Sequence, residues 1–146
     1  MYESIVVGTD GSVTAQRAVD EATRLAKALG ARLHVVSAFE PLRGARVVGA
    51  PKGEPTVAPD ANVRAIVDEA AARVRLSDVS VQAHTVDGDP ADALIETARR
   101  ERASLIVVGS CGMHGVGRVL GSVPNKVSHR ARCHVLIVAT ENDDAG

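Results

Sequence analysis

The chain has 146 residues, the size of a single domain, because two separate cores would each be too small to be stable. Hydrophobic residues make up 45% and charged residues 24%, which predicts a globular fold and excludes disorder throughout. The formal net charge is −1, and Tyr2 and Phe39 are the only aromatic residues. The composition therefore offers no basic surplus for nucleic acid and almost no aromatic surface for stacking bases.

No apolar run approaches the roughly 20 residues that span a bilayer. The first residues lack the basic segment and the cleavage site of a signal peptide. The two cysteines, Cys111 and Cys133, form neither a disulfide framework nor a zinc-ligand spacing. We therefore expect a cytoplasmic protein that does not enter a membrane.

Short apolar runs alternate with helical patterns along the chain. The expected strands are 4–8, 33–38, 79–86, 105–109 and 135–138, and the expected helices are 15–29, 59–76, 91–102 and 122–131. Gly30 ends the first helix, while Asp89 and Pro90 are the expected N-cap and first residue of the third. Residues 40–58, rich in proline and glycine, predict a loop or lid.

This alternation predicts an α/β fold, a single doubly wound domain with helices on both faces of a five-stranded parallel sheet. Residues 79–86 alternate between apolar and polar, as in an edge strand with one exposed face. With right-handed crossovers the natural strand order is then 3-2-1-4-5. We expect one domain over residues 1–140, followed by an acidic tail at 141–146.

In such a sheet ligands bind beyond the carboxyl ends of the strands, where the winding reverses, here between the first and fourth strands. Two clusters rich in glycine and hydroxyl groups converge there. Gly8, Thr9 and Asp10 begin the segment after the first strand, and the segment after the fourth runs from Gly109 to Gly112. Their agreement with the topological rule predicts a binding site at this point.

The second segment continues to Gly121 and Ser122 at the start of the fourth helix. Glycines let backbone N–H groups approach an anion, and a helix N-terminus favours phosphate. Ser122 is an N-cap or a donor to a phosphate oxygen. A strand–helix loop that needs glycines only for its turns is the alternative, and the segment alone leaves both open.

Three stretches together resemble the universal stress protein family: Ile5–Ser12, Val107–Gly112 and Leu120–Val138. The resemblance covers residues 3–140. Gly109, Gly112, Gly121 and Ser122 follow the glycine pattern of the family's ATP-binding branch. Eight residues rather than nine separate Gly112 from Gly121, which makes the phosphate loop one residue shorter.

The resemblance implies binding of an adenine nucleotide, ATP first, with AMP or cyclic AMP as alternatives and Mg²⁺ as a companion of ATP. The residues that it assigns to the nucleotide are Asp10 at the end of the first strand, Val35 by its backbone at adenine, Val108 and Gly109 at the ribose, and Gly112, Gly121, Ser122 and Val123 at the phosphates. From the residues themselves, Asp10 caps the first helix, contacts the ligand, or does both. Thr9 and Ser12 are better explained as turn and cap residues than as catalytic groups.

Other chemistry is weakly supported. Ser110, His114 and Asp10 lack the Gly-x-Ser-x-Gly elbow of a hydrolase. Zinc ligands at Cys111 with His114, or at Cys133 with His134, lack a complete set of four. The spacing of the glycines does not fit a dinucleotide fingerprint. We therefore predict no catalytic and no metal-binding residue, and interpret His34 and His84 as packed or surface residues of strands.

These observations favour a stress-response regulatory protein that binds a nucleotide and is not an enzyme. Asp10 is the only carboxylate placed near the γ-phosphate, and no partner to position water is evident. A slow ATPase or self-phosphorylating protein and an interaction module with an empty site are the alternatives.

We also expect a homodimer, because the last strand is an apolar outer edge with only a short acidic tail after it. That strand consists of Val135, Leu136, Ile137 and Val138. The family resemblance implies the same arrangement.

Overall fold

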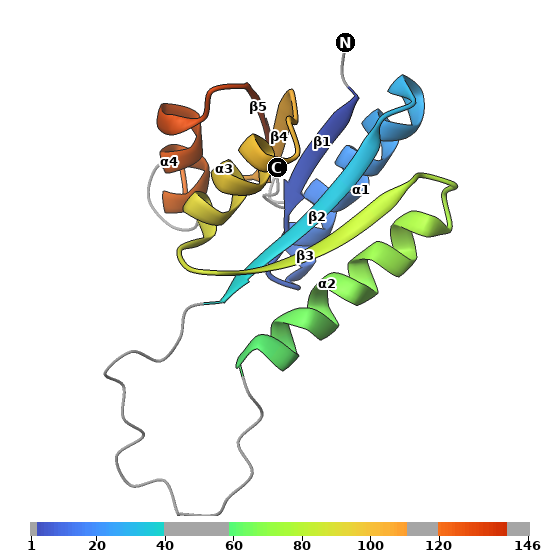
Figure 1. Cartoon of the computed structure of the whole chain (residues 1–146), viewed down its shortest axis with the longest axis horizontal. Helices are drawn as coiled ribbons and strands as arrows, with labels where there is room; N and C mark the ends of the chain where they lie inside the picture. Colours follow the sequence, from blue (N-terminus) through green and yellow to red (C-terminus); the bar gives the residue numbers. More distant parts are fainter. Residues whose placement is uncertain (1–2, 40–58, 111–119, 140–146) are drawn as a thin grey trace, which may run out of the picture.

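The structure, a computed structural model, describes residues 3–39, 59–110 and 120–139. In these ranges the chain alternates strands and helices (Figure 1). Their order is β1 (Ser4–Gly8), α1 (Val13–Leu29), β2 (Arg32–Phe39), α2 (Pro59–Arg75), β3 (Val81–Asp87), α3 (Pro90–Arg100), β4 (Leu105–Gly109), α4 (Ser122–Arg130) and β5 (His134–Val138). The predicted lid at 40–58, most of the glycine segment and the acidic tail lie outside the described residues.

The strands form one parallel sheet of order β3-β2-β1-β4-β5. The predicted α/β fold and strand order are confirmed, with β3 and β5 at the edges. β3 begins at Val81, two residues later than predicted, because its pairing with β2 starts where Leu33 faces Val81. The winding reverses between β1 and β4, so their carboxyl ends are the place where this fold holds ligands.

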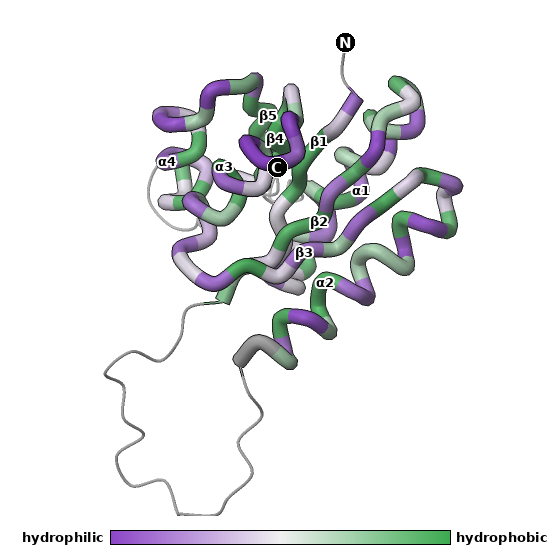
Figure 2. Tube along the Cα trace, viewed as in Figure 1, coloured by the Kyte–Doolittle hydropathy of each residue, from purple (hydrophilic) through white to green (hydrophobic). Residues whose placement is uncertain are grey.

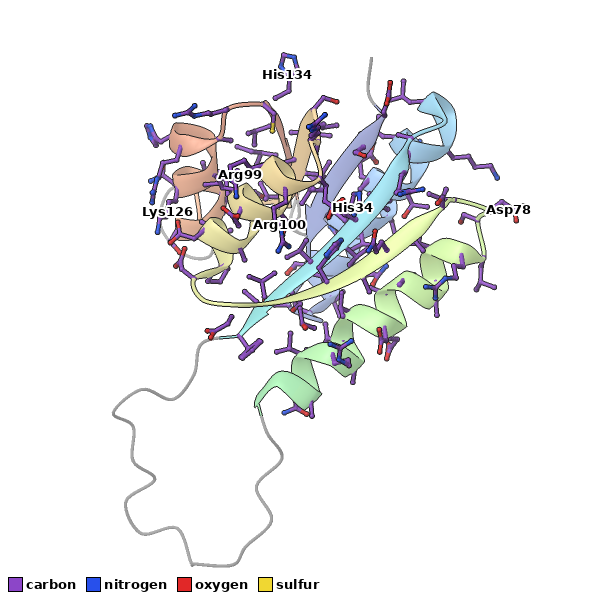
Figure 3. All side chains as sticks on the ribbon, viewed as in Figure 1. His34, Asp78, Arg99, Arg100, Lys126 and His134 are labelled. Atoms are coloured by element: carbon purple, nitrogen blue, oxygen red, sulfur yellow. The ribbon has the colours of Figure 1, made fainter. Side chains whose placement is uncertain are left out.

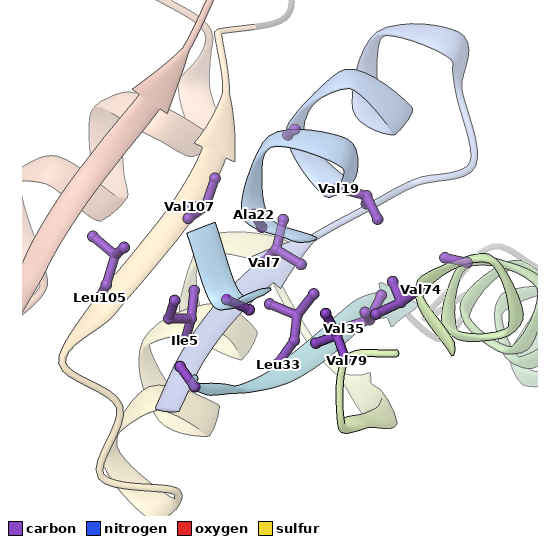
Figure 4. Packing of buried hydrophobic residues seen from close by; sticks show 14 of the residues in the cluster. Ile5, Val7, Val19, Ala22, Leu33, Val35, Val74, Val79, Leu105 and Val107 are labelled. Carbon is purple, nitrogen blue, oxygen red and sulfur yellow. The ribbon is translucent and has the colours of Figure 1, made fainter. Parts of the chain in front are cut away.

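Alternate residues of the central strands point to opposite faces of the sheet. Ile5, Val7 and Val35 pack with α1 and α2, as Figure 4 shows, while Val6 and Val36 pack with α3 and α4. Because both faces are covered, β1 and β4 are hydrophobic along most of their length (Figure 2). None of the described helices is long and apolar enough to cross a membrane.

The helix ends follow the predicted signals. Ser12 caps α1 by accepting a hydrogen bond from the Ala15 N–H, and Gly30 ends the helix in the left-handed conformation. Asp89 caps α3 through the Asp92 N–H, and Pro90 occupies the first turn. These caps fix where α1 and α3 begin, and both helices begin beside the carboxyl end of the sheet.

Candidate functional site

A pocket lies at the carboxyl ends of β1, β2 and β4, at the predicted reversal of the winding. Its lining is mostly aliphatic, with a few hydroxyl and backbone groups and one carboxylate. The lining residues are Gly8, Thr9, Asp10, Ala15, Val36, Ser37, Ala38, Pro90, Leu94, Val108, Gly109 and Val123. Ligand pockets are commonly built in this way, from apolar walls with a few polar groups that orient the ligand.

Gly8 shapes one wall of the pocket because it has no side chain. A Cβ at this position would lie 3.0 Å from Cδ2 of Leu94 on α3. Leu94 is itself buried in the core on the α3 side of the sheet. The glycine therefore lets α3 pack closely against the end of β1 and keeps Leu94 in the pocket wall.

The loop between β1 and α1 is held by its own polar side chains. The Thr9 N–H donates to the carbonyl of Val36 at 2.9 Å, and the Thr9 hydroxyl accepts from the Gly11 N–H at 3.1 Å. The Asp10 carboxylate accepts from the Ser12 N–H at 2.9 Å. Ser12 is the N-cap of α1, so the capping role considered for Asp10 is wrong, whereas the turn and cap roles of Thr9 and Ser12 are confirmed. Asp10 is exposed and lines the pocket.

The N-terminus of α4 meets the same pocket through Val123. Gly121 is the N-cap of this helix, and no side chain makes a capping hydrogen bond. Ser122 is therefore not the N-cap, which corrects one of its two predicted roles; it is the exposed first residue of the helix. With no acidic residue in its first turn, this end of α4 carries the partial positive charge of the helix dipole uncompensated by a side chain of its own.

Ion pairs tie the start of α3 to α4 beside the pocket. Lys126, labelled in Figure 3, lies 3.1 Å from the carboxylate of Asp89 and 3.4 Å from that of Asp92. Arg130 also pairs with Asp92, at 3.3 Å. The Asp92 backbone N–H, helped by Lys126, holds the pKa of Asp89 below its usual range. These charges fix the two helices whose first turns contribute Pro90 and Val123 to the pocket.

Most of the predicted binding residues come together here, and their binding role stays a prediction. Gly8, Thr9, Asp10, Val108, Gly109 and Val123 line the pocket. Gly121 and Ser122 stand next to it at the α4 terminus, and Gly112 lies outside the described residues. Val35 is fully buried on the opposite face, and Val36, Ser37 and Ala38 supply the lining from β2.

Six lining residues were missed by the sequence prediction: Ala15, Val36, Ser37, Ala38, Pro90 and Leu94. The β2 residues could have been predicted as pocket lining, because the predicted strand order places the carboxyl end of the second strand beside that of the first. Alanine and leucine at helical spacing carry no comparable signal. They are the same residues that any buried helix face contains.

The described residues include only some members of the alternative catalytic and zinc-binding sets. Ser110 is buried and its N–H donates to the carbonyl of Val138, while His114 and Cys111 lie outside the described residues. Cys133 is half-buried, and burial raises the pKa of its thiol, which favours the protonated form. His134 is exposed at the start of β5. The predicted absence of catalytic residues stays a prediction.

The profile of the universal stress protein family matches residues 1–139. The chain belongs to the universal stress protein family. Universal stress protein Rv1636 of Mycobacterium tuberculosis is 41% identical over 143 residues, covering 95% of this chain and 97% of the relative. A universal stress protein of Thermus aquaticus is 37% identical over 145 residues, with 94% and 99% covered.

Among solved structures, a universal stress protein in complex with cAMP is similar over nearly the whole chain. The two chains are 37% identical, the TM-score is 0.76, and 96% of this chain and 98% of the other are covered. The family membership expected from Ile5–Ser12, Val107–Gly112 and Leu120–Val138 is confirmed.

Proposed function

We propose that this universal stress protein binds an adenine nucleotide in the pocket at the carboxyl ends of β1, β2 and β4. One observation carries the proposal: the apolar pocket at the reversal of the winding opens beside a helix N-terminus that has no side-chain cap. An apolar wall suits a purine base, and an uncapped helix terminus suits phosphate. A nucleotide combines both requirements in one ligand.

The arrangement suggests an orientation for the nucleotide. The aliphatic side chains of Ala15, Ala38 and Leu94 form the wall that suits the base. The backbone at Gly109 and the first turn of α4 at Val123 form the polar side that suits ribose and phosphate. Mg²⁺ would accompany ATP, with the Asp10 carboxylate at the pocket as its candidate contact.

We propose ATP as the first ligand to test and cyclic AMP as the second. ATP is favoured by the glycine pattern at Gly109, Gly112, Gly121 and Ser122. Cyclic AMP is favoured because a solved relative that is 37% identical holds it. The shortened glycine loop separates the two, since a triphosphate needs more backbone donors than a cyclic monophosphate.

We propose that binding, rather than turnover, is the function, in a regulatory role under stress. Phosphoryl transfer needs a group that orients the attacking water and groups that hold the metal. Asp10 is the one carboxylate among the described lining residues. A rate of ATP hydrolysis typical of enzymes, about 1–1000 per second, that disappears in Asp10→Asn would show that this part of the proposal is wrong.

The decisive experiment identifies the ligand and then blocks its site. Chromatography of nucleotide released from the denatured protein shows what the protein carries. Calorimetry with ATP, ADP, AMP and cyclic AMP then compares affinities. Ala38→Phe places a ring in the pocket and should abolish binding, whereas Ala72→Phe, exposed on α2 outside the lining, should leave binding unchanged. No binding to the unmodified protein at millimolar nucleotide would refute the proposal.

We further propose a homodimer formed through β5. In the described part of the chain β5 pairs with β4 on one side only, and its four apolar residues are half-buried rather than covered. Pairing the same edge across a two-fold axis would satisfy the edge's backbone groups. Light scattering should give a dimer mass, and Ile137→Pro should give monomers because proline removes a backbone donor. A monomer mass for the unmodified protein at micromolar concentration would contradict the proposal.

A further inference from the structure

Two histidines and a glutamate form a polar cluster on the α3 side of the sheet, away from the pocket. Nδ1 of His34 lies 2.9 Å from Nε2 of His84, and Nε2 of His34 lies 3.9 Å from Oε1 of Glu101. One ring nitrogen from each histidine and one carboxylate oxygen all lie within 4.8 Å of one another. In the described part of the chain, no other group of three such side chains is arranged in this way.

The register of the sheet and the end of α3 bring these residues together. His34 precedes Val36 by two residues on β2, and His84 stands beside Val36 in the pairing of β2 with β3. Residues two apart share a face, so both histidines face the side of the sheet that α3 covers. Glu101 is the C-cap of α3. Figure 3 shows His34 on β2 and Arg100 on α3, next in sequence to Glu101.

His34 is an unusual residue for this position, because only 1% of its surface is exposed among valines and leucines. The two rings are tilted by 43° with their centroids 5.0 Å apart, so they meet through their nitrogens rather than as a parallel stack. Burial lowers the pKa of both histidines.

We propose that His34, His84 and Glu101 form a binding site for a zinc ion. Two imidazoles and one carboxylate match the ligand preferences of zinc, which binds nitrogen at about 2.0–2.1 Å and carboxylate oxygen at about 2.0–2.2 Å. One ligand atom from each residue already lies within 4.8 Å of the other two, which is the proximity that a shared ion requires. Glu101 is one-third exposed, so a water molecule can reach the fourth position.

A hydrogen-bonded histidine pair without a metal is the competing explanation. Such a pair satisfies one nitrogen of each ring and leaves the Glu101 carboxylate 3.9 Å from the second nitrogen of His34, beyond hydrogen-bond distance. Arg32 and Arg100 add nearby positive charge, yet both are exposed to solvent, where their charge is screened. The glutamate therefore supplies the negative charge that a buried cation needs.

The site does not depend on the proposed nucleotide function. Pro90 and Leu94 of the pocket lie in the first half of α3, whereas Glu101 follows the last residue of this helix. A helix of 11 residues is about 16 Å long at 1.5 Å per residue. Metal binding and nucleotide binding can therefore be measured separately, and either can fail without the other.

The test uses the full chain after treatment with a chelator and dialysis. Calorimetry with zinc chloride should show one ion bound per chain. Glu101→Gln and His84→Gln should each weaken binding by at least the roughly tenfold loss seen when groups around a metal are removed. His129→Gln changes an exposed histidine on α4 and should bind zinc as the unmodified chain does.

Cobalt(II) in place of zinc reports which atoms bind. Visible absorption of a four-coordinate ion without the near-ultraviolet band of a thiolate ligand would support the site. A thiolate band would assign the metal to a cysteine and overturn the proposal. Zinc affinity equal in the unmodified chain and in Glu101→Gln would also overturn it. Since Glu101 is partly exposed, this variant should fold, which circular dichroism checks.

Discussion

The pocket and the histidine cluster occupy opposite ends of α3 and share the same face of β2, yet they are built from different materials. The pocket consists of glycine, alanine and backbone, with Gly8, Ala38 and Gly109 where the strands end. The cluster consists of long polar side chains, placed in the middle of strands and at a helix C-terminus. The pocket leaves open space between the strand ends, whereas the cluster fills its space with polar side chains.

The pocket and the cluster therefore tolerate different substitutions. The pocket exists because its lining residues at the strand ends have small side chains or none. A larger side chain there should therefore reduce binding more than the removal of a charge. In the cluster, the two histidines satisfy each other's hydrogen bonds. Replacing one histidine should therefore lower the stability more than replacing both.

Leu94→Ala should destabilise the protein by about 2–5 kcal/mol, because it leaves a cavity in the core beside the pocket. Leu94 is 3% exposed and packs with Val6 and Val36 on the α3 side of the sheet. Leu76→Ala, at a residue that is 85% exposed, is the matched control and should change stability by less than about 0.5 kcal/mol. Urea unfolding measures both, and equal costs would show that the pocket wall is not part of the core.

His84→Leu should cost about 1–3 kcal/mol in metal-free protein, because it leaves the buried His34 ring without its hydrogen-bond partner. The double variant His34→Leu with His84→Leu should be more stable than His84→Leu alone, since no imidazole nitrogen of the cluster is then left unpaired. His129→Leu is the exposed control. Thermal unfolding with a chelator present measures the series; additive losses would contradict the coupling.

Gly11→Ala should cost about 1–2 kcal/mol, because an L-residue is strained in the left-handed region. Gly11 has a φ of 86°, and a Cβ there would lie 3.1 Å from Cγ1 of Ile66 on α2. Gly30→Ala is the control: its φ is 67°, but a Cβ would meet nothing within 4 Å. Chemical unfolding should show the larger loss at position 11, and equal losses would mean that Ile66 moves aside freely.

Asp89→Ala should cost about 0.5–2 kcal/mol through loss of the α3 N-cap. The Asp92 N–H and Lys126 lower the pKa of Asp89 in the folded state. Its stabilising effect is therefore present above the unfolded carboxyl pKa of about 3.9 and is lost as the pH falls through the lower folded value. Asp89→Asn keeps a capping oxygen and removes this pH dependence. Unfolding measurements should find the unmodified protein more stable than Asp89→Asn at pH 7, and this difference should shrink as the pH falls through the folded pKa of Asp89.

Much of this protein follows from its sequence. Continuous apolar runs such as Ile5–Val7 predicted buried parallel strands, and the alternating third strand predicted an edge; together they gave the strand order. Local rules placed the caps at Ser12 and Asp89, because capping involves residues only three apart. The glycine clusters located the pocket, since the carboxyl ends of parallel strands meet at one edge of the sheet.

The tertiary structure decided what depends on packing between distant segments. Val35 packs in the core on the α1 and α2 side of the sheet, whereas Val36 and Ala38 line the pocket. The reason is that successive residues of a strand point to opposite faces of the sheet. The tertiary structure also joined residues 34, 84 and 101, whose separation in the sequence follows no motif spacing. Sequence patterns predict interactions between residues that are close along the chain. Contacts such as those among residues 34, 84 and 101 depend instead on the register of β2 with β3 and on where α3 ends.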